Sequence, residues 1–351
     1  MGISQPARQP TLDEVAALAG VSRSAASRVI NNAPHVSAAK REAVLRAVAE
    51  LGYVPNPTAR ALATSQVGSV VFAVTNDNPA AFGDPFFAQV VRGVSTELAK
   101  TDLELMLVVA PSPHGRERLR RLVRARRADG VMLMALSGDD PLAHLAEETG
   151  VPVVFGGRPL HVEPRWYVDV DNRAGARLAV EHLIRTGHRR IATITGPLDT
   201  DVATARHRGF RDAMAEAGLS ADRVAAGDFT EAGGVAAMTR LLDAHPDLDA
   251  VFATNDAMAA GALRVLRAHG RDVPGDVGVV GFDDLPAASH TDPQLTTVHQ
   301  PIEALGREMA RMLVALLAGE RPCPIILPAR LVLRDSVRPR AVPAGEAATG
   351  R

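Results

Sequence analysis

The stretch that decides the architecture of the amino-terminal region is TLDEVAALAGVSRSAASRVINN, residues 11–32. Thr11 and Glu14 have the spacing of a capping box, which predicts that a helix begins here. Gly20 predicts the end of that helix, and Ser22 is a typical N-cap for a second helix that runs almost to the end of the stretch. Two helices joined by so short a turn are typical of a helix-turn-helix motif, whose second helix enters the DNA major groove.

The second helix has one packed side and one polar side. The residues predicted to pack are Val21, Ala25, Ala26, Val29 and Ile30, and those left to face outward are Arg23, Ser24, Ser27 and Arg28. The two that open the helix, Arg23 and Ser24, are candidates for base recognition, because this end approaches the base edges and Arg is the usual bidentate reader of guanine. Arg28 is expected to contact a base or a phosphate. The alternative is that all of them are solvated residues of an ordinary surface helix.

A third helix and a basic charge balance complete this head. Ser37 is expected to cap a helix that continues to Leu51 and ends at Gly52. Pro57 then opens a short segment of good helix formers without an apolar stripe, which should become helical only with a partner such as DNA. Residues 1–66 contain seven Lys and Arg against four Asp and Glu, whereas the whole chain has a net charge of −1. A basic head on an acidic body is the distribution expected when only the head meets a polyanion.

From Val67 onward, short apolar strands alternate with amphipathic helices. The expected strands are 70–74, 105–109, 131–135, 153–155, 191–195, 250–253 and 277–281, and the expected helices are 86–100, 116–128, 172–186, 204–217, 233–244 and 256–268. Continuous apolar strands between helices predict parallel sheets covered on both faces. The predicted fold is therefore a small all-α helix-turn-helix head followed by an α/β body with two parallel sheets.

Pockets in open parallel sheets lie beyond the carboxyl ends of the strands, so the polar residues that follow each strand are candidates for ligand binding. These residues are Asn76, Asp77, Arg158, Asn255, Asp256, Asp283 and Asp284. Carboxylates and amides hydrogen-bond to vicinal hydroxyls, and Arg bridges two oxygens. The set therefore suits a sugar-like ligand. For Asp256 and Asp284, as for Asp171, a role as strand-end cap or inter-lobe ion pair is the favoured alternative.

Five segments in this order resemble the lactose-repressor/galactose-repressor (LacI/GalR) family. They are TLDEVAALAGVSRSAASRVINN (11–32), HVSAAKREAVLRAVAELGYVPNPTARALA (35–63), DNRAGARLAVEHLIRTGHRRIATITGP (171–197), FATNDAMAAGAL (252–263) and VGVVGFDDLP (277–286). The resemblance covers residues 10–338. It implies a ligand-responsive transcriptional regulator, most simply a repressor of a sugar or other carbon-source operon, that binds a near-palindromic operator as a homodimer or a dimer of dimers.

The resemblance also assigns roles to residues of the head. It places Arg23, Ser24 and Arg28 at base-reading positions, and Ser22, Asn31 and His35 at phosphate contacts. Leu62 matches a hinge leucine that wedges into the minor groove, and the residues that would line the same groove are Asn56, Ala59 and Arg60. The pair Ala25-Ala26 departs from the Thr-Val that is frequent in the family, so one phosphate contact is expected to be missing.

For the body, the resemblance implies a periplasmic-binding-protein-like core whose two lobes close on a small-molecule effector. Arg206 matches an arginine that grips the effector and Asp283 a ligand-binding aspartate, while Phe86 and Phe229 match positions where an aromatic ring stacks on the ligand. The segment formed by residues 76–84 is longer than is usual before Pro85, so the lid over the pocket is expected to be unusual.

The predicted domains are a DNA-binding head (1–54), a hinge helix and linker (55–66), an effector-binding and dimerisation body (67–340) and a disordered tail (341–351). A single cysteine, Cys323, cannot form an internal disulfide, and with no secretory signal or long apolar run the chain is expected to be cytoplasmic. The tail lacks leucine heptads, which favours a dimer over a tetramer. The histidine spacing fits no zinc motif, and no cofactor is expected.

Two other classes of protein remain as alternatives. A solute-binding protein of a transport system fits the body alone, but it predicts a signal peptide and no helical head. An enzyme on a doubly wound fold would need a phosphate loop, a Gly-x-Gly-x-x-Gly turn or a nucleophile elbow, and the sequence contains none of them. Activation or repression, and induction or corepression by the effector, stay open.

Overall fold

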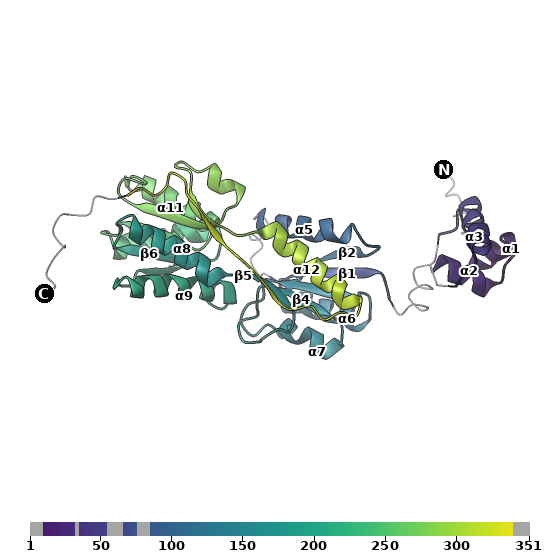
Figure 1. Cartoon of the computed structure of the whole chain (residues 1–351). Coiled ribbons are helices and arrows are strands. Elements are labelled where there is room, and N and C mark those ends of the chain that lie inside the picture. Colours follow the sequence, from purple (N-terminus) through teal and green to yellow (C-terminus); the bar gives the residue numbers. More distant parts are fainter. Residues whose placement is uncertain (1–9, 32–34, 55–65, 76–84, 340–351) are drawn as a thin grey trace, which may run out of the picture. The chain divides into compact units, whose positions relative to one another are not determined.

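The computed structural model describes residues 10–31, 35–54, 66–75 and 85–339 (Figure 1). The chain divides into two compact units, Met1–Gly68 and Ser69–Arg351. Apart from Gln66, the predicted hinge segment (55–66) and the predicted tail (341–351) lie outside the described residues.

The smaller unit contains helices α1 (Leu12–Leu18), α2 (Arg23–Ile30) and α3 (Ala38–Leu51). The capping box is present at α1, since Thr11 Oγ1 accepts a hydrogen bond from the Glu14 amide while the Glu14 carboxylate accepts one from the Thr11 amide. Ser22 caps α2, and Gly52 ends α3 in the left-handed conformation with a φ of 61°. Ser37 precedes α3 as predicted, but its side chain makes no capping hydrogen bond.

The three helices bury a small core. Its fully buried members are Val15, Ala16, Ala26, Val29, Val44 and Ala47. The helices pack on one another in all three pairings. So small a core, made mainly of Val and Ala side chains, is typical of a domain of this length.

The first lobe of the larger unit is built on a parallel sheet in the order β11-β5-β4-β3-β1-β2. The strands are β1 (Ser69–Val74), β2 (Glu104–Val109), β3 (Gly130–Met134), β4 (Val153–Gly156), β5 (Tyr167–Val170) and β11 (Ile325–Leu327), and the helices are α5 (Pro85–Leu98), α6 (Pro113–Arg124), η2 (Pro141–His144), α7 (Leu145–Thr149) and α12 (Ile302–Leu317). Alternate residues of β1 pack under α5 and α12 on one face and under α6 and α7 on the other. This two-sided burial explains why β1 is apolar throughout.

The second lobe repeats the plan with the sheet order β12-β10-β9-β8-β6-β7. Its strands are β6 (Ile191–Thr195), β7 (Val224–Ala226), β8 (Ala250–Ala253), β9 (Gly278–Asp283), β10 (Thr296–His299) and β12 (Arg330–Val332), and its helices are α8 (Asn172–Arg185), α9 (Asp201–Glu216), α10 (Glu231–Ala244), α11 (Asp256–Ala268) and η3 (Pro286–Ser289). Helices α8 and α9 cover one face, and α10 and α11 cover the other. Only β12 runs antiparallel among the strand pairs described.

The chain crosses between the lobes three times within the described residues. The crossings run from β5 to α8, from β10 to α12 and from β11 to β12. Helix α12, drawn in yellow-green in Figure 1, packs on α5 and on β3, β4 and β5, so a segment from the end of the chain completes the first lobe. Residues at these crossings therefore lie next to both lobes.

The predicted elements are confirmed as strands and helices, with end points that differ by a few residues. Sequence patterns did not identify β5, β7, β10, α7, α12, β11 or β12. The missed strands have only three or four residues each, and β10, Thr296-Thr297-Val298-His299, is mainly polar. Such strands give a weak apolar signal because the neighbouring strands, not their own residues, place them in the sheet.

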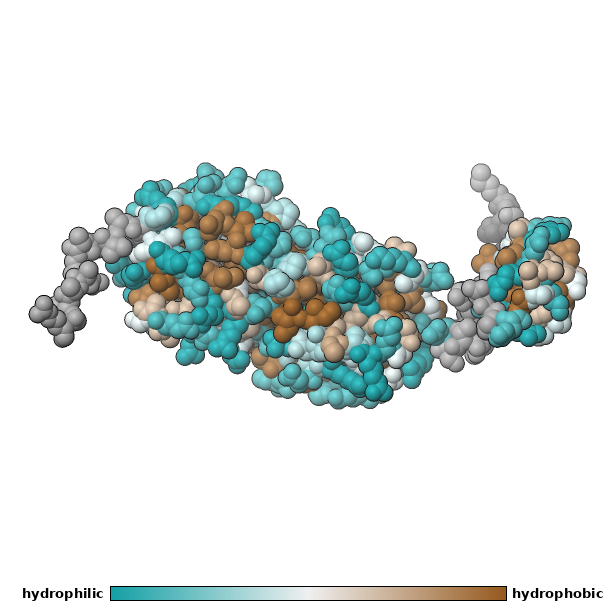
Figure 2. Space-filling model, viewed as in Figure 1, coloured by the Kyte–Doolittle hydropathy of each residue, from teal (hydrophilic) through white to brown (hydrophobic). Residues whose placement is uncertain are grey.

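The surface of the larger unit is mixed. On the face drawn in Figure 2, apolar side chains gather in patches between polar ones. Elsewhere in the described structure, Leu107 and Val109 of the edge strand β2 are 58% and 50% exposed. No helix among the described residues has the length and apolarity to span a bilayer.

Candidate functional site

Helix α2 presents the polar face that the sequence predicts. Ala25, Ala26 and Val29 are buried in the head core, whereas Arg23 and Arg28 are exposed. Ser22 and Ser24 are exposed at the same end of the helix, and their hydroxyl oxygens lie 3.1 Å apart. The N-terminus of α2 therefore combines an exposed Arg, two hydroxyls and the positive end of the helix dipole, with no acid in its first turn.

The exposed residues of α2 make only weak contacts within the head. Arg23 Nε lies 3.5 Å from Asp13 Oδ1, and both side chains are largely exposed. Arg28 Nε donates to the Ser24 carbonyl oxygen at 3.4 Å, and Asn31 Nδ2 donates to Ser27 Oγ at 3.3 Å. His35 is exposed and has a φ of 65°. These side chains can exchange their present contacts for new ones at little cost.

Six of the predicted candidate residues lie outside the described structure. They are Asn56, Ala59, Arg60 and Leu62 of the predicted hinge and Asn76 and Asp77 after β1.

A cavity of about 360 Å³ lies in the larger unit and is lined by both lobes. The residues that follow β3 and β4 form its wall in the first lobe, and those that follow β6, β7, β8 and β9 form its wall in the second. This is the location that the strand-end rule predicts. The predicted residues that line the cavity are Phe86, Arg158, Arg206, Phe229, Asn255 and Asp283.

Arg206 of α9 is the centre of the polar wall. Its Nε donates to Asn172 Oδ1 at 2.9 Å, and its Nη1 donates to the Thr254 carbonyl and, at 3.3 Å, to Asp283 Oδ1. The guanidinium lies 3.7 Å from the centroid of the Phe282 ring. Burial lowers the pKa of Arg206, and the Asp283 carboxylate opposes that shift.

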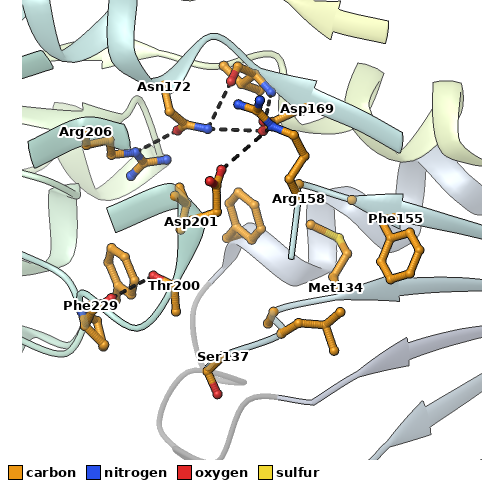
Figure 3. A pocket seen from close by; sticks show the side chains of 18 of the residues that line it. Met134, Ser137, Phe155, Arg158, Asp169, Asn172, Thr200, Asp201, Arg206 and Phe229 are labelled. Atoms are coloured by element: carbon orange, nitrogen blue, oxygen red, sulfur yellow. Dashed lines mark hydrogen bonds and ion pairs between the residues drawn. The ribbon is translucent and has the colours of Figure 1, made fainter. Parts of the chain in front are cut away.

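The second terminal nitrogen of Arg206, Nη2, has no hydrogen-bond partner recorded within the described part of the chain. Figure 3 shows Arg206 with Nε directed at Asn172 and the rest of the guanidinium facing the cavity. The residue therefore offers one donor to a ligand while its other nitrogens fix its orientation.

Arg158 and two carboxylates form a second polar group in which both lobes take part (Figure 3). Arg158 Nε donates to Asp169 Oδ2 at 3.0 Å and lies 3.8 Å from Asp201 Oδ2 at the start of α9. Asp169 also accepts from Asn172 Nδ2 at 3.2 Å. Burial raises the pKa of Asp169 and that of Asp201, and the Arg158 charge opposes both shifts.

The loop after β7 places an aromatic ring at the cavity. Phe229 has a φ of 67°, and its carbonyl oxygen accepts a hydrogen bond from Asn255 Nδ2 at 2.9 Å. Its ring lies against Gly196, where a Cβ atom would approach the ring to 2.1 Å. Asn255 also caps α11, because its Oδ1 accepts from the Met258 amide. Asn255 thus positions Phe229 as well as lining the cavity.

Asp256 does not line the cavity. Its carboxylate lies behind Gly281, where it accepts hydrogen bonds from Thr297 Oγ1 at 2.6 Å and from the Leu285 amide at 2.8 Å. Burial, followed by the Asp283 charge, raises its pKa well above the ordinary value. The placement favours the structural alternative, so direct contact of Asp256 with an effector stays a prediction without support from the geometry.

Asp284 also has a structural environment. It pairs with Arg334 Nη2 at 2.6 Å and with His299 Nδ1 at 3.0 Å. Asp171 caps α8, because its Oδ1 accepts from the Ala174 amide at 3.0 Å.

Sequence reasoning missed several residues that line the cavity. Asp169, Asn172, Asp199, Asp201, Asp228 and Gln300 are all part of its wall. Asp169 lies in β5 and Gln300 follows β10, and neither strand was recognised. Gln300 Nε2 donates to Asp283 Oδ1 at 2.6 Å. The strand-end rule would have found Gln300 if the polar strand before it had been identified.

The remaining wall is apolar. Its members include Phe86, Phe87, Leu133, Met134, Leu136, Phe155 and Leu305. Figure 3 shows Met134 and Phe155 below the polar group around Arg158. Within the described ranges, no group of three or more His, Cys, Asp or Glu side chains is placed to hold a metal ion. A cavity with one apolar wall and one wall of fixed donors and acceptors suits a small organic ligand with hydroxyl groups.

Comparison with known families and proteins agrees with both parts of the structure. Residues 11–56 match the lacI family of bacterial regulatory proteins, and residues 180–337 match the periplasmic binding protein-like domain. The HTH-type transcriptional regulator CelR of Thermobifida fusca is 50% identical over 94% of this chain and 98% of its own length. GalR of Escherichia coli strain K12 is 39% identical over 97% of this chain and 99% of its own length.

Solved structures show the same relationship. A complex of the transcriptional regulator CelR with cellobiose has a TM-score of 0.75 and 48% identity, and it covers 93% of this chain and 100% of that one. A lac repressor dimer bound to operator and an anti-inducer has a TM-score of 0.81 and 30% identity over 94% of this chain and 100% of that one. The chain therefore belongs to the lacI family of bacterial regulatory proteins, and it is a helix-turn-helix transcriptional regulator, not an enzyme.

Proposed function

We propose that the protein is a cytoplasmic, sugar-responsive repressor that binds a near-palindromic operator as a homodimer and changes its operator affinity when an effector occupies the inter-lobe cavity. One observation carries the proposal. The chain that contains the exposed recognition helix α2 also contains a cavity whose polar groups come from both lobes. Its organisation would be a head (1–54), a hinge and linker (55–66), a body (67–340) and a tail (341–351).

On the DNA side, Arg23 and Ser24 would read bases and Arg28 would read a base or clamp a phosphate. Ser22, Asn31 and His35 would contact phosphates, as the amide-rich start of a helix also does. The exposure of Arg23 and its weak pairing with Asp13 support this assignment. Asn56, Ala59, Arg60 and Leu62 would act in the minor groove, and their assignment rests on sequence resemblance alone.

On the effector side, the ligand would lie between Arg206 and Arg158 and face the Phe229 ring. Arg206 and Asp283 would bind hydroxyl groups with hydrogen bonds whose directions the wall already fixes. Phe86 and Phe229 would cover the apolar faces of the sugar ring. Structures similar to this chain include a cellobiose complex, which supports a sugar as the effector.

Coupling between the two sites would start with closure of the lobes. Contacts already cross the cavity mouth, since the Gly138 amide donates to the Asp199 carbonyl at 2.7 Å and Arg158 lies near Asp201. A ligand that bridges the lobes stabilises the closed arrangement and changes the relative positions of the first-lobe surfaces that face the partner subunit. Such coupling amounts to about 1–3 kcal/mol in typical proteins.

The dimer would use the exposed edge of the first lobe. Strand β2 ends the sheet and exposes Leu107 and Val109, which a second copy of the chain would cover. An uncovered apolar edge strand would otherwise invite aggregation. Analytical ultracentrifugation tests this assignment. The wild type should sediment as a dimer and a Leu107→Lys variant as a monomer.

The function as a whole is tested by thermal shift and gel shift on one preparation. A screen of sugars and nucleobases should find a compound that stabilises the wild type but not Asp283→Ala, and the same compound should change retardation of DNA that flanks the protein's own gene. Equal stabilisation of both proteins would remove Asp283 from the site. An absence of any retarded band, with or without the compound, would refute the proposal.

A further inference from the structure

The charges around the cavity are unequal in number. Five acidic residues, Asp169, Asp199, Asp201, Asp228 and Asp283, are among those that line it, against the two cations Arg158 and Arg206. The excess is therefore three negative charges when all seven groups are ionised. All seven residues border a single cavity of about 360 Å³, so their charges act on a ligand bound there.

Both arginines already share their positive charge with carboxylates of the protein, although Arg206 keeps Nη2 as a donor for a ligand. Arg206 is already bonded to Asp283 and is only 4% exposed. Arg158 is bonded to Asp169 and lies close to Asp201. A phosphate or carboxylate on the ligand that approaches either guanidinium would also approach the protein carboxylate already paired with it, and this repulsion offsets the attraction to the cation.

The excess negative charge belongs mainly to the second lobe. Asp199 and Asp228 have no cationic partner within the described residues, and the nearest cation to Asp201 is Arg158 Nε at 3.8 Å. Asp228 accepts hydrogen bonds from the amide and the hydroxyl of Thr230, which hold its carboxylate in place. The sequence of residues 76–84, NDNPAAFGD, contains no Lys, Arg or His, so that segment brings no positive charge to the protein wherever it lies.

We infer that the cavity selects an uncharged polyhydroxylated effector and rejects phosphorylated or acidic sugars, with Asp199, Asp201 and Asp228 as the residues that determine this choice. The inference rests on the proposed function, whose sugar class it narrows. The physical basis is repulsion between like charges in a partly enclosed site, which weakens the wrong ligand without adding a contact to the right one. A neutral sugar instead uses the same carboxylates as hydrogen-bond acceptors.

The inference is tested with matched pairs of ligands that differ in charge. Isothermal titration calorimetry on the full chain would compare cellobiose with cellobionate, galactose with galacturonate and ribose with ribose 5-phosphate. For the pair whose neutral member binds, the anion should bind at least about tenfold more weakly at low salt. The difference should shrink at high salt, because screening weakens charge repulsion but not hydrogen bonding.

Variants assign the effect to the named residues. The difference in affinity between the neutral and the anionic ligand should decrease in the double variant Asp199→Asn/Asp201→Asn. It should decrease further in the triple variant that adds Asp228→Asn. Asp243→Asn on the exposed side of α10 removes the same charge away from the cavity and should leave the gap unchanged. If a variant does not fold, the salt dependence of the affinity difference in the wild type still tests whether charge repulsion causes it.

The outcomes separate this inference from the proposed function. An anion that binds as tightly as its neutral partner overturns the charge selection while leaving a sugar-responsive regulator in place. A gap that persists in the triple variant removes the three carboxylates as its cause. If neither member of any pair binds, the sugar assignment itself fails, and the charge selection fails with it.

Discussion

The exposed face of α2 and the wall of the inter-lobe cavity use polar residues in opposite ways. On α2, Arg23 and Arg28 are exposed and make weak contacts that DNA would replace. In the cavity, Arg206 is buried and bonded to groups from α8, β9 and the end of β8. The difference teaches that a change on α2 should alter binding without altering stability, whereas a change at the cavity should alter both. The predictions below run from the largest to the smallest expected effect on the free energy of unfolding.

Arg206→Ala should destabilise the larger unit by about 3–5 kcal/mol, because it leaves the buried Asp283 carboxylate without its cation. Thermal unfolding followed by circular dichroism measures this change, and effector binding should be lost as well. Arg211→Ala, an exposed position on the same helix, serves as the control and should unfold like the wild type. If the Arg206 variant unfolds like the control, buried Arg206 contributes no more to the free energy of unfolding than an exposed arginine does, and the contrast fails.

Gly196→Ala should cost about 1–3 kcal/mol, because the new Cβ atom enters space held by the Phe229 ring. The ring would move, and effector affinity would fall with it. In a Phe229→Ala background the same substitution should cost much less. A double-mutant cycle in urea measures the coupling, and additive effects of the two substitutions would contradict contact between these residues.

Asp256→Asn should change how the free energy of unfolding depends on pH. The folded-state pKa of Asp256 is raised above its unfolded value, so the folded protein holds the proton more tightly and stability falls as pH rises from about 4 towards the raised pKa. The loss from this group is at most about 1.4 kcal/mol per pH unit. The Asn side chain resembles the protonated acid, so the variant should lose less stability over this range in melting experiments. Parallel pH profiles for the two proteins would refute the assignment.

Arg23→Ala should change the free energy of unfolding by less than about 0.5 kcal/mol, as expected of an exposed residue. Its effect should be on recognition, with about 1–3 kcal/mol of operator discrimination lost and non-specific affinity nearly kept. Fluorescence anisotropy with operator and scrambled DNA measures both quantities. Arg46→Ala on α3, which removes an exposed cation paired with Glu42, is the matched control. Equal losses on both DNAs would make Arg23 a phosphate contact.

The same contrast explains what could be predicted from the sequence. The head follows from local signals, since Thr11, Ser22 and Gly52 each mark a helix boundary that neighbouring residues alone decide. Most of the α/β body follows from apolar periodicity, and Arg158, Arg206 and Asp283 follow from the strand-end rule together with the family resemblance.

The rest depends on distant residues. Gln300 and Asp169 reach the cavity from β10 and β5, and each of these strands also pairs with a strand near the end of the chain, β12 and β11 respectively. Asp256 looks like a cavity residue because it follows a strand, but Gly281 and Thr297 enclose it. The local sequence does not indicate whether a carboxylate at the end of a strand faces the cavity or the interior of the lobe.

The most direct test of the central claim is operator affinity of the full chain during titration with a sugar that calorimetry shows to occupy the cavity. The apparent operator Kd should shift about 5- to 150-fold on saturation, with no shift in an Asp283→Asn variant that no longer binds the sugar. A sugar that binds the protein stoichiometrically and leaves operator affinity unchanged would contradict the account.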